Sequence, residues 1–360
     1  MQERGISAGA IGILLFVHGL VSALAEVPSG ALGDRVGHRL VTVIGLLLWG
    51  ASLILFAVGA GEPALCVAMV LWGIGMALFS GAPAALVVNE MKDSAQGDLV
   101  DDVVGASQTA RWAAAGVGAL VVVAGADRAS GLIIGIAAGL MITMAGVVQM
   151  TWPDAKGRQP VDAPIGVMAA IGTFRSGRLM LLLVAACIQG VAFAALLIGT
   201  QPLVMSYGFS LSDLGWVLLL CMVAMTGGTL IAGPFRNHPF ATVCLSSAVV
   251  GVCIMLASAG PIGGVWLIFA QVALGVGVTT CMVWAHKLFS DEVRNTQASV
   301  LSFASGVSGA FTDWGFGLVW SDMGLAGALV TFGILVSLSA AGAFLLGMLL
   351  ERRAGVELMR

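Results

Sequence analysis

Eleven runs of about twenty apolar residues, separated by short polar segments, constrain this chain of 360 residues more than any other feature. The runs cover residues 8–29, 41–60, 64–88, 103–125, 130–151, 179–199, 211–232, 241–259, 262–285, 298–319 and 325–348. A helix needs about 20 mostly apolar residues to cross the hydrocarbon core of a bilayer. The pattern therefore predicts an all-α membrane protein with about eleven transmembrane helices, and it leaves no room for a large soluble catalytic domain.

Charged residues are too scarce for a surface that faces water on all sides. Only 10% of the residues are charged and 59% are hydrophobic, whereas a soluble domain carries roughly a quarter charged residues. The net charge of −3 comes without the basic cluster that nucleic acid binding requires. We therefore expect membrane lipid as the surroundings and no nucleic acid as a partner. The six cysteines lie singly in apolar runs, so we expect no metal site, no disulfide framework and no cofactor.

The basic residues predict how the chain is oriented. Thirteen of the 16 lie in alternate connections: Arg35, Arg39, Lys92, Lys156, Arg158, Arg175, Arg178, Arg236, Lys287, Arg294, Arg352, Arg353 and Arg360. Arg4 and Arg128 fall on the opposite side, and Arg111 lies within a run. Since cytoplasmic loops carry an excess of Lys and Arg, the larger set is expected to be cytoplasmic. We predict a multi-pass protein of the bacterial inner membrane.

A glycine-rich motif follows the first apolar run. Residues 30–39 read Gly-Ala-Leu-Gly-Asp-Arg-Val-Gly-His-Arg. This resembles the signature of the major facilitator superfamily, which in that family joins the second and third helices on the cytoplasmic side. The charge distribution independently places this connection on the same side.

The resemblance implies a major-facilitator-type bundle of two pseudo-symmetric halves that works as a monomer. The expected halves are residues 1–152, with five spans, and residues 179–360, with six, joined by the cytoplasmic segment 153–178. In the family the motif follows the second helix rather than the first. We therefore expect that the counterpart of helix one is absent, through a misplaced start or a truncated gene.

The resemblance also implies a gating role for the motif and for an acid near the end of the third run. Arg35 is expected to pair with that acid, and Asp34 to face the start of the run at 298–319. The gating residues implied are Gly30, Asp34, Arg35, Gly37, Arg39 and Glu90.

Four ionisable residues lie within apolar runs, where charge is costly and normally faces a cavity or a partner. His18, Glu26, Arg111 and Asp313 are therefore candidates for substrate binding or proton coupling, and we hypothesise that His18 and Asp313 form a proton-coupling pair. The alternatives are structural: an ion pair for Arg111, a cap for Glu26, and a hydrogen bond from a hydroxyl such as that of Thr312 for Asp313.

Other polar side chains within the runs are candidates for lining a cavity, although each one alone also suits a hydrogen bond between helices. The candidates are Gln108, Gln189, Gln201, Gln271 and Trp284. In addition, the spacing of Gly131, Gly135 and Gly139 permits close helix packing.

The function expected from these features is secondary active transport of a small organic solute. Proton-coupled efflux by alternating access is preferred over uptake of a metabolite. An enzyme is not expected, because no cluster of carboxylates, histidines or cysteines stands at catalytic spacing. The other alternative is a membrane protein that does not transport, such as a remnant or a partner subunit.

Overall fold

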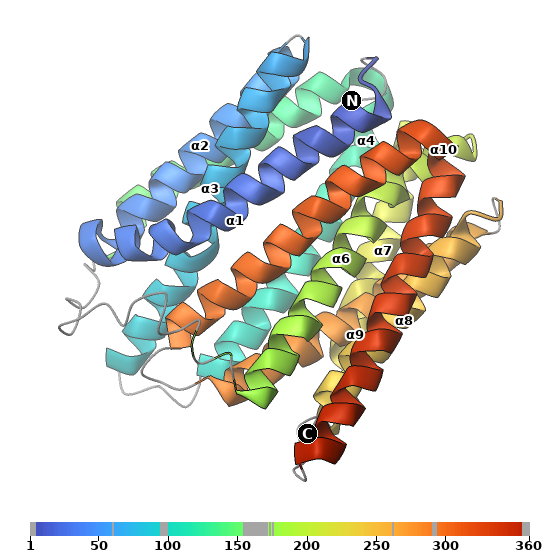
Figure 1. Ribbon diagram of the computed structural model, residues 1–360. Coiled ribbons are helices and arrows are strands. Elements are labelled where there is room, and N and C mark those ends of the chain that lie inside the picture. Colours follow the sequence, from blue (N-terminus) through green and yellow to red (C-terminus); the bar gives the residue numbers. More distant parts are fainter. Residues whose placement is uncertain are drawn as a thin grey trace. The chain divides into compact units, whose positions relative to one another are not determined.

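The computed structural model describes residues 5–59, 61–93, 100–153, 172, 174, 176–260, 263–289 and 294–354 (Figure 1). All regular elements in these residues are helices, so the predicted all-α class is confirmed. The elements are α1 (Ala8–Val36), α2 (His38–Val58), α3 (Gly61–Asp93), α4 (Val100–Thr151), α6 (Gly177–Ser206), α7 (Leu211–Ile231), η3 (Gly233–Asn237), α8 (Pro239–Ala257), α9 (Gly264–Leu288) and α10 (Arg294–Ala354).

Nine helical stretches in the described residues are long and apolar enough to cross a membrane, against eleven predicted spans. The two spans predicted at the C-terminus, 298–319 and 325–348, count as one because α10 is assigned as a single element from Arg294 to Ala354. Its helical backbone is nevertheless interrupted at Gly324, between the two predicted spans. Of the predicted span 103–125, the stretch Ala110–Ala124 is apolar but short. A single helix assignment, α4, covers Val100–Thr151. Within it the apolar stretches Ala110–Ala124 and Gly131–Thr151 correspond to the two predicted spans 103–125 and 130–151.

The chain forms two compact units. Unit 1 contains Met1–Phe16, Trp112–Ala124 and Ile165–Arg360, and unit 2 contains Val17–Arg111 and Gly125–Pro164. Helices α1 and α4 contribute segments to both units.

Unit 1 is a bundle in which α10 folds back on itself. The chain turns at Gly324, which has φ 75° and ψ 172°, a conformation that glycine adopts without the steric cost of a Cβ. The two parts of α10 therefore run in opposite directions and diverge from the turn (Figure 1), and the rings of Phe316 and Phe332, one from each part, meet with centroids 5.3 Å apart. Leu329 and Ile254 complete the centre of this core.

Glycines allow the backbones of unit 1 to approach one another closely. A Cβ added to Gly12 on α1 would lie 2.8 Å from the carbonyl oxygen of Asp313 and from the Cα of Gly317 on α10. On α9, Gly275 meets the backbone of α7 at Met225, while Gly277 meets Gln189 of α6 and Ser246 of α8. Such small residues are typical of helix interfaces in membranes, where van der Waals packing replaces the hydrophobic drive.

Glycines also allow close contact between helix backbones in unit 2. A Cβ on Gly75 would lie 2.9 Å from the carbonyl oxygen of Gly45 on α2, and one on Gly73 would lie 2.7 Å from the carbonyl oxygen of His18 on α1. Two residues along a helix differ by about 200° in direction, so these glycines serve two different neighbours of α3.

The glycines on α4 behave differently. No described atom lies within 4 Å of a Cβ added to Gly131, Gly135 or Gly139. Their spacing permits close packing, but no described residue packs against them, since spacing alone does not supply a partner helix.

A single residue connects α1 to α2. Helix α1 continues to Val36, seven residues beyond the predicted end, and α2 begins at His38. Gly37 between them has φ 99° and ψ 138°. Gly33 is held against the imidazole of His38, whose Nδ1 would lie 2.7 Å from an added Cβ. The two glycines thus make a very tight connection possible.

We predict that Gly75→Ala lowers the stability of the protein. The methyl group would meet backbone atoms of α2, and overpacking of this kind costs about 1–3 kcal/mol. Gly139→Ala, with open space around its Cβ, serves as the matched control and should leave the thermal midpoint unchanged or higher. Thermal unfolding in detergent micelles measures both, and equal midpoints would contradict the packing described here.

We predict that Gly37→Ala also destabilises the protein, for a conformational reason. At φ 99° an L-residue is strained, at a cost of about 1–3 kcal/mol. Gly146→Ala on α4 is the control, because it lies within a helix and has no described atom near its added Cβ. The difference in thermal midpoint between the two variants is the measurement, and a Gly37→Ala protein as stable as the control would refute the assignment of strain.

Candidate functional site

A polar face of α1 packs against α3 in unit 2. His18, Ser22 and Glu26 recur every four residues, so they share one face of the helix. The carboxylate Oε1 of Glu26 accepts a hydrogen bond of 3.0 Å from the hydroxyl of Ser80 on α3. Gly73 on α3 lies directly against the backbone of His18 and Ser22, which brings the two helices into contact along this face.

The imidazole of His18 lies in this interface beside an indole. Its ring centroid is 4.7 Å from that of Trp72, with an interplanar angle of 53°. Nε2 of His18 and Nε1 of Trp72 are both buried and have no hydrogen-bond partner among the described residues. Because buried polar groups normally have a partner, this pair marks the α1–α3 face as a candidate binding site.

The described part of the glycine motif anchors the start of α2. Nη1 of Arg39 donates a hydrogen bond of 3.2 Å to the carbonyl oxygen of Trp152, at the end of α4. The side chains of Asp34, Arg35 and Glu90 lie outside the described residues, as does any side-chain environment of Gly30. The predicted pairing of Arg35 with Glu90 therefore stays a prediction.

Asp313 lies in unit 1, on the face of α10 that crosses α1. Its carboxyl group is half-buried and no described residue donates a hydrogen bond to it. The hydroxyl of Thr312 donates instead to the carbonyl oxygen of Ser308, at 2.8 Å, so the alternative bond between Thr312 and Asp313 is not formed. His18 belongs to unit 2, and its predicted pairing with Asp313 stays a prediction.

The remaining candidates have different surroundings. Arg111 is exposed on α4, and Gln201 is exposed near the end of α6. Gln189 is buried and its Nε2 donates to the hydroxyl of Ser246 at 3.2 Å, so it joins α6 to α8. Gln271 is buried on α9. The side chain of Gln108 lies outside the described residues.

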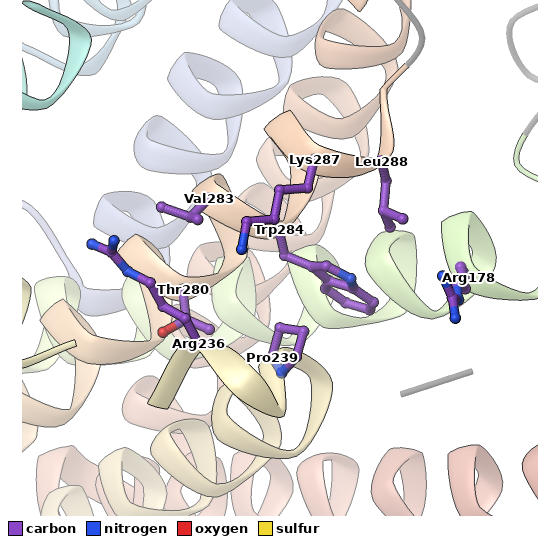
Figure 2. Close-up of a pocket in the computed structure, with 8 residues that line it drawn as sticks. All are labelled: Arg178, Arg236, Pro239, Thr280, Val283, Trp284, Lys287 and Leu288. Atoms are coloured by element: carbon purple, nitrogen blue, oxygen red, sulfur yellow. The ribbon is translucent and has the colours of Figure 1, made fainter. Parts of the chain in front are cut away.

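Trp284 takes part in a pocket that the sequence did not predict. The pocket has a volume of about 220 Å³ and is lined by Arg178, Arg236, Pro239, Thr280, Val283, Trp284, Lys287 and Leu288 (Figure 2). From the sequence alone, Arg178, Arg236 and Lys287 predict only the orientation of the chain in the membrane. The sequence places all three on the same side of the membrane, but it does not predict that they line one pocket, because that depends on how α6, η3 and α9 pack together.

Known proteins support the family resemblance. The sequence profile of the Major Facilitator Superfamily matches residues 1–312. Over 96 residues, the chain is 34% identical to the inner membrane transport protein YajR of Escherichia coli (strain K12). The aligned segment makes up 26% of this chain and 19% of YajR, so the chain matches about a fifth of that relative's length.

Solved structures share the architecture at low sequence identity. The nucleoside transporter NupG superposes with a TM-score of 0.69 at 12% identity, covering 95% of this chain and 91% of NupG. A POT family transporter in complex with a thioalcohol-conjugated peptide gives 0.72 at 12% identity, with 95% and 88% covered. A bacterial homologue of the human lysosomal transporter Spinster, facing inward and unoccupied, gives 0.67 at 15% identity, with 94% and 89% covered.

The helical architecture, the apolar spans and the match of the family profile to most of the chain agree with one another. The chain is a multi-pass membrane protein that belongs to the Major Facilitator Superfamily.

Proposed function

We propose that the protein is a secondary active transporter that moves a small organic solute across the bacterial inner membrane by alternating access, coupled to protons. The observation that carries this proposal is the half-buried carboxyl group of Asp313, which lies within an apolar span without a described hydrogen-bond donor. Ionisable groups are rare in such spans and typically mark substrate or ion pathways.

The polar face of α1 contains further groups that could carry protons or bind the solute. An imidazole can accept and release a proton, and Nε2 of His18 has no hydrogen-bond partner among the described residues. Glu26 lies two turns further along the same face. We infer that His18 and Asp313 exchange protons as one coupled pair, and that Glu26 or Arg111 contacts the solute.

We also propose that the chain is organised into two halves. These are residues 1–152 and 179–360, joined by residues 153–178. In an alternating-access cycle the tight connection at Gly37 would transmit movement between α1 and α2, and Asp34, Arg35, Arg39 and Glu90 would hold the gate. These residues would act without touching the solute.

Efflux is the direction proposed, and uptake is the alternative. The solved structures that share the fold are named for nucleosides and peptides, so the fold serves chemically different solutes. A non-transporting membrane protein is the remaining alternative, and the first experiment below distinguishes it.

We predict that the full chain, reconstituted into proteoliposomes, moves radiolabelled organic solutes only when a proton gradient is imposed. A panel of nucleosides, short peptides and amphipathic cations should contain at least one solute whose transport collapses on addition of a proton uncoupler. Absence of transport for the whole panel in either direction, from a protein shown to be folded, would favour the non-transporting alternative.

We predict that Asp313→Asn abolishes accumulation driven by the proton gradient, by at least about tenfold, because the amide cannot carry a proton. Exchange of labelled for unlabelled solute needs no net proton movement and should persist. Asp322→Asn, an exposed position on the same helix, is the matched control and should transport normally.

The same assay tests the proposed pair. His18→Gln should shift or flatten the dependence of transport on pH, because it removes the imidazole that is proposed to carry a proton. Coupling that is unaltered in both His18→Gln and Asp313→Asn would eliminate these residues as the proton carriers.

A further inference from the structure

The pocket of Figure 2 gathers basic side chains from three separate elements of unit 1. Arg178 lies in the first turn of α6, Arg236 in η3 between α7 and α8, and Lys287 in the last turn of α9. All three side chains are exposed. They lie at the end of the helices that the distribution of basic residues assigns to the cytoplasm.

Beneath these cations the pocket has a buried floor with two polar groups. Thr280 is 1% exposed and Trp284 is 3% exposed. The hydroxyl of Thr280 and the indole Nε1 of Trp284 have no hydrogen-bond partner among the described residues. Trp284 is held in place by Phe240, with ring centroids 6.2 Å apart, so its N–H is fixed rather than free to turn toward water.

The arrangement of the floor and rim suits a ligand that carries oxygen acceptors and negative charge. Figure 2 shows the indole of Trp284 beside Pro239, with Arg236 and Lys287 to one side and Arg178 to the other. The eight residues that line the described pocket include three cations and no acid. In Figure 2 the Thr280 hydroxyl lies on the side of Arg236, whereas the indole nitrogen of Trp284 lies on the side of Arg178. A headgroup with several oxygens would accept a hydrogen bond from Nε1 of Trp284 with one oxygen and from the Thr280 hydroxyl with another, while Arg236 and Lys287 balance the charge of its phosphate.

The size of the pocket and its surroundings favour a lipid headgroup. Sites for drug-sized solutes are about 300–1,000 Å³, whereas this pocket has about 220 Å³. Apolar side chains within five residues of these basic residues in the sequence are exposed: Met180 by 42%, Ile231 by 51%, Phe235 by 49% and Met282 by 38%. In a membrane protein such a surface contacts acyl chains, and basic pockets between helices on the cytoplasmic side bind anionic headgroups.

We propose that this pocket binds the phosphate of an anionic phospholipid headgroup from the cytoplasmic leaflet. Arg178, Arg236 and Lys287 attract the phosphate, the two buried donors of the floor bind different oxygens of the headgroup, and the exposed apolar side chains contact the acyl chains. The lipid site does not depend on transport activity. The protein could therefore transport a solute without binding the lipid here, or bind the lipid here without transporting a solute.

The test measures lipid retention by the purified full chain in detergent, by native mass spectrometry, during titration with dioleoyl phosphatidylglycerol. Each basic residue near an anionic lipid surface contributes about 1 kcal/mol, which corresponds to about a fivefold change in affinity. The double variant R236Q/K287Q should therefore bind the lipid about 25-fold more weakly. Trp284→Phe keeps the ring and removes the N–H, and should weaken binding about tenfold.

Controls separate this site from general attraction between charges. Arg352→Gln removes an exposed basic residue near the end of α10, outside the pocket, and should bind the lipid like the unaltered protein. Dioleoyl phosphatidylcholine, with no net charge, should be retained at least about tenfold less than phosphatidylglycerol. Thermal midpoints without added lipid confirm that each variant is folded.

Two results would overturn the proposal. One is equal loss of phosphatidylglycerol in Arg352→Gln and in R236Q/K287Q, which would mean that no particular site is involved. The other is thermal protection by inorganic phosphate, lost in R236Q/K287Q, without preferential retention of phosphatidylglycerol. That outcome would assign the pocket to a soluble phosphate instead of a lipid.

Discussion

Close contact between helix backbones at glycine is the interaction on which the rest of this structure depends. Lipid tails are as apolar as leucine, so burial of apolar side chains does not by itself drive helices together in a bilayer. Glycine lets the backbones approach until many weak van der Waals contacts add up. Gly12 with Gly317 joins α1 to α10, and Gly45 with Gly75 joins α2 to α3. Since these contacts involve backbone atoms, they fix the helices more firmly than flexible side chains would.

This packing also decides which polar groups find partners. Where Gly277 brings α9 against α6 and α8, Nε2 of Gln189 donates to the hydroxyl of Ser246, although the buried Oε1 of Gln189 has no described partner. Where Gly73 brings α3 against α1, the rings of His18 and Trp72 lie in contact at a tilt, but their buried nitrogens have no described partner. The first arrangement is structural. The second keeps polar groups in an apolar span at a cost in free energy, which is the usual sign that a ligand or a proton is involved.

Most of the helices could be predicted from the sequence, because twenty apolar residues in succession have few alternatives to a membrane helix. The predictions failed where contacts between helices had to be inferred from a local sequence pattern. The apolar run predicted at 8–29 starts where α1 starts, but α1 continues to Val36, with Pro28 inside the helix. Gly131, Gly135 and Gly139 have the spacing of a helix interface, yet no described neighbour occupies that face. Gly73 and Gly75, two residues apart, contact two different helices.

For the candidate site, the sequence predicted which residues are of interest, whereas their contacts could be seen only in the structure. Scarcity of charge in the spans was enough to single out His18, Glu26 and Asp313, because an ionisable group in lipid is costly wherever it lies. The hydrogen bond from Ser80 to Glu26, the orientation of the Thr312 hydroxyl toward Ser308, and the convergence of Arg236 and Lys287 on Trp284 depend on residues far apart in the chain. The sequence by itself determined that lipid surrounds the protein, that the fold is all-α and which family the chain belongs to, since these follow from composition and from a local motif. Only the tertiary structure decided which polar groups are satisfied and where basic residues gather, because both depend on the close approach of helices that are distant in sequence.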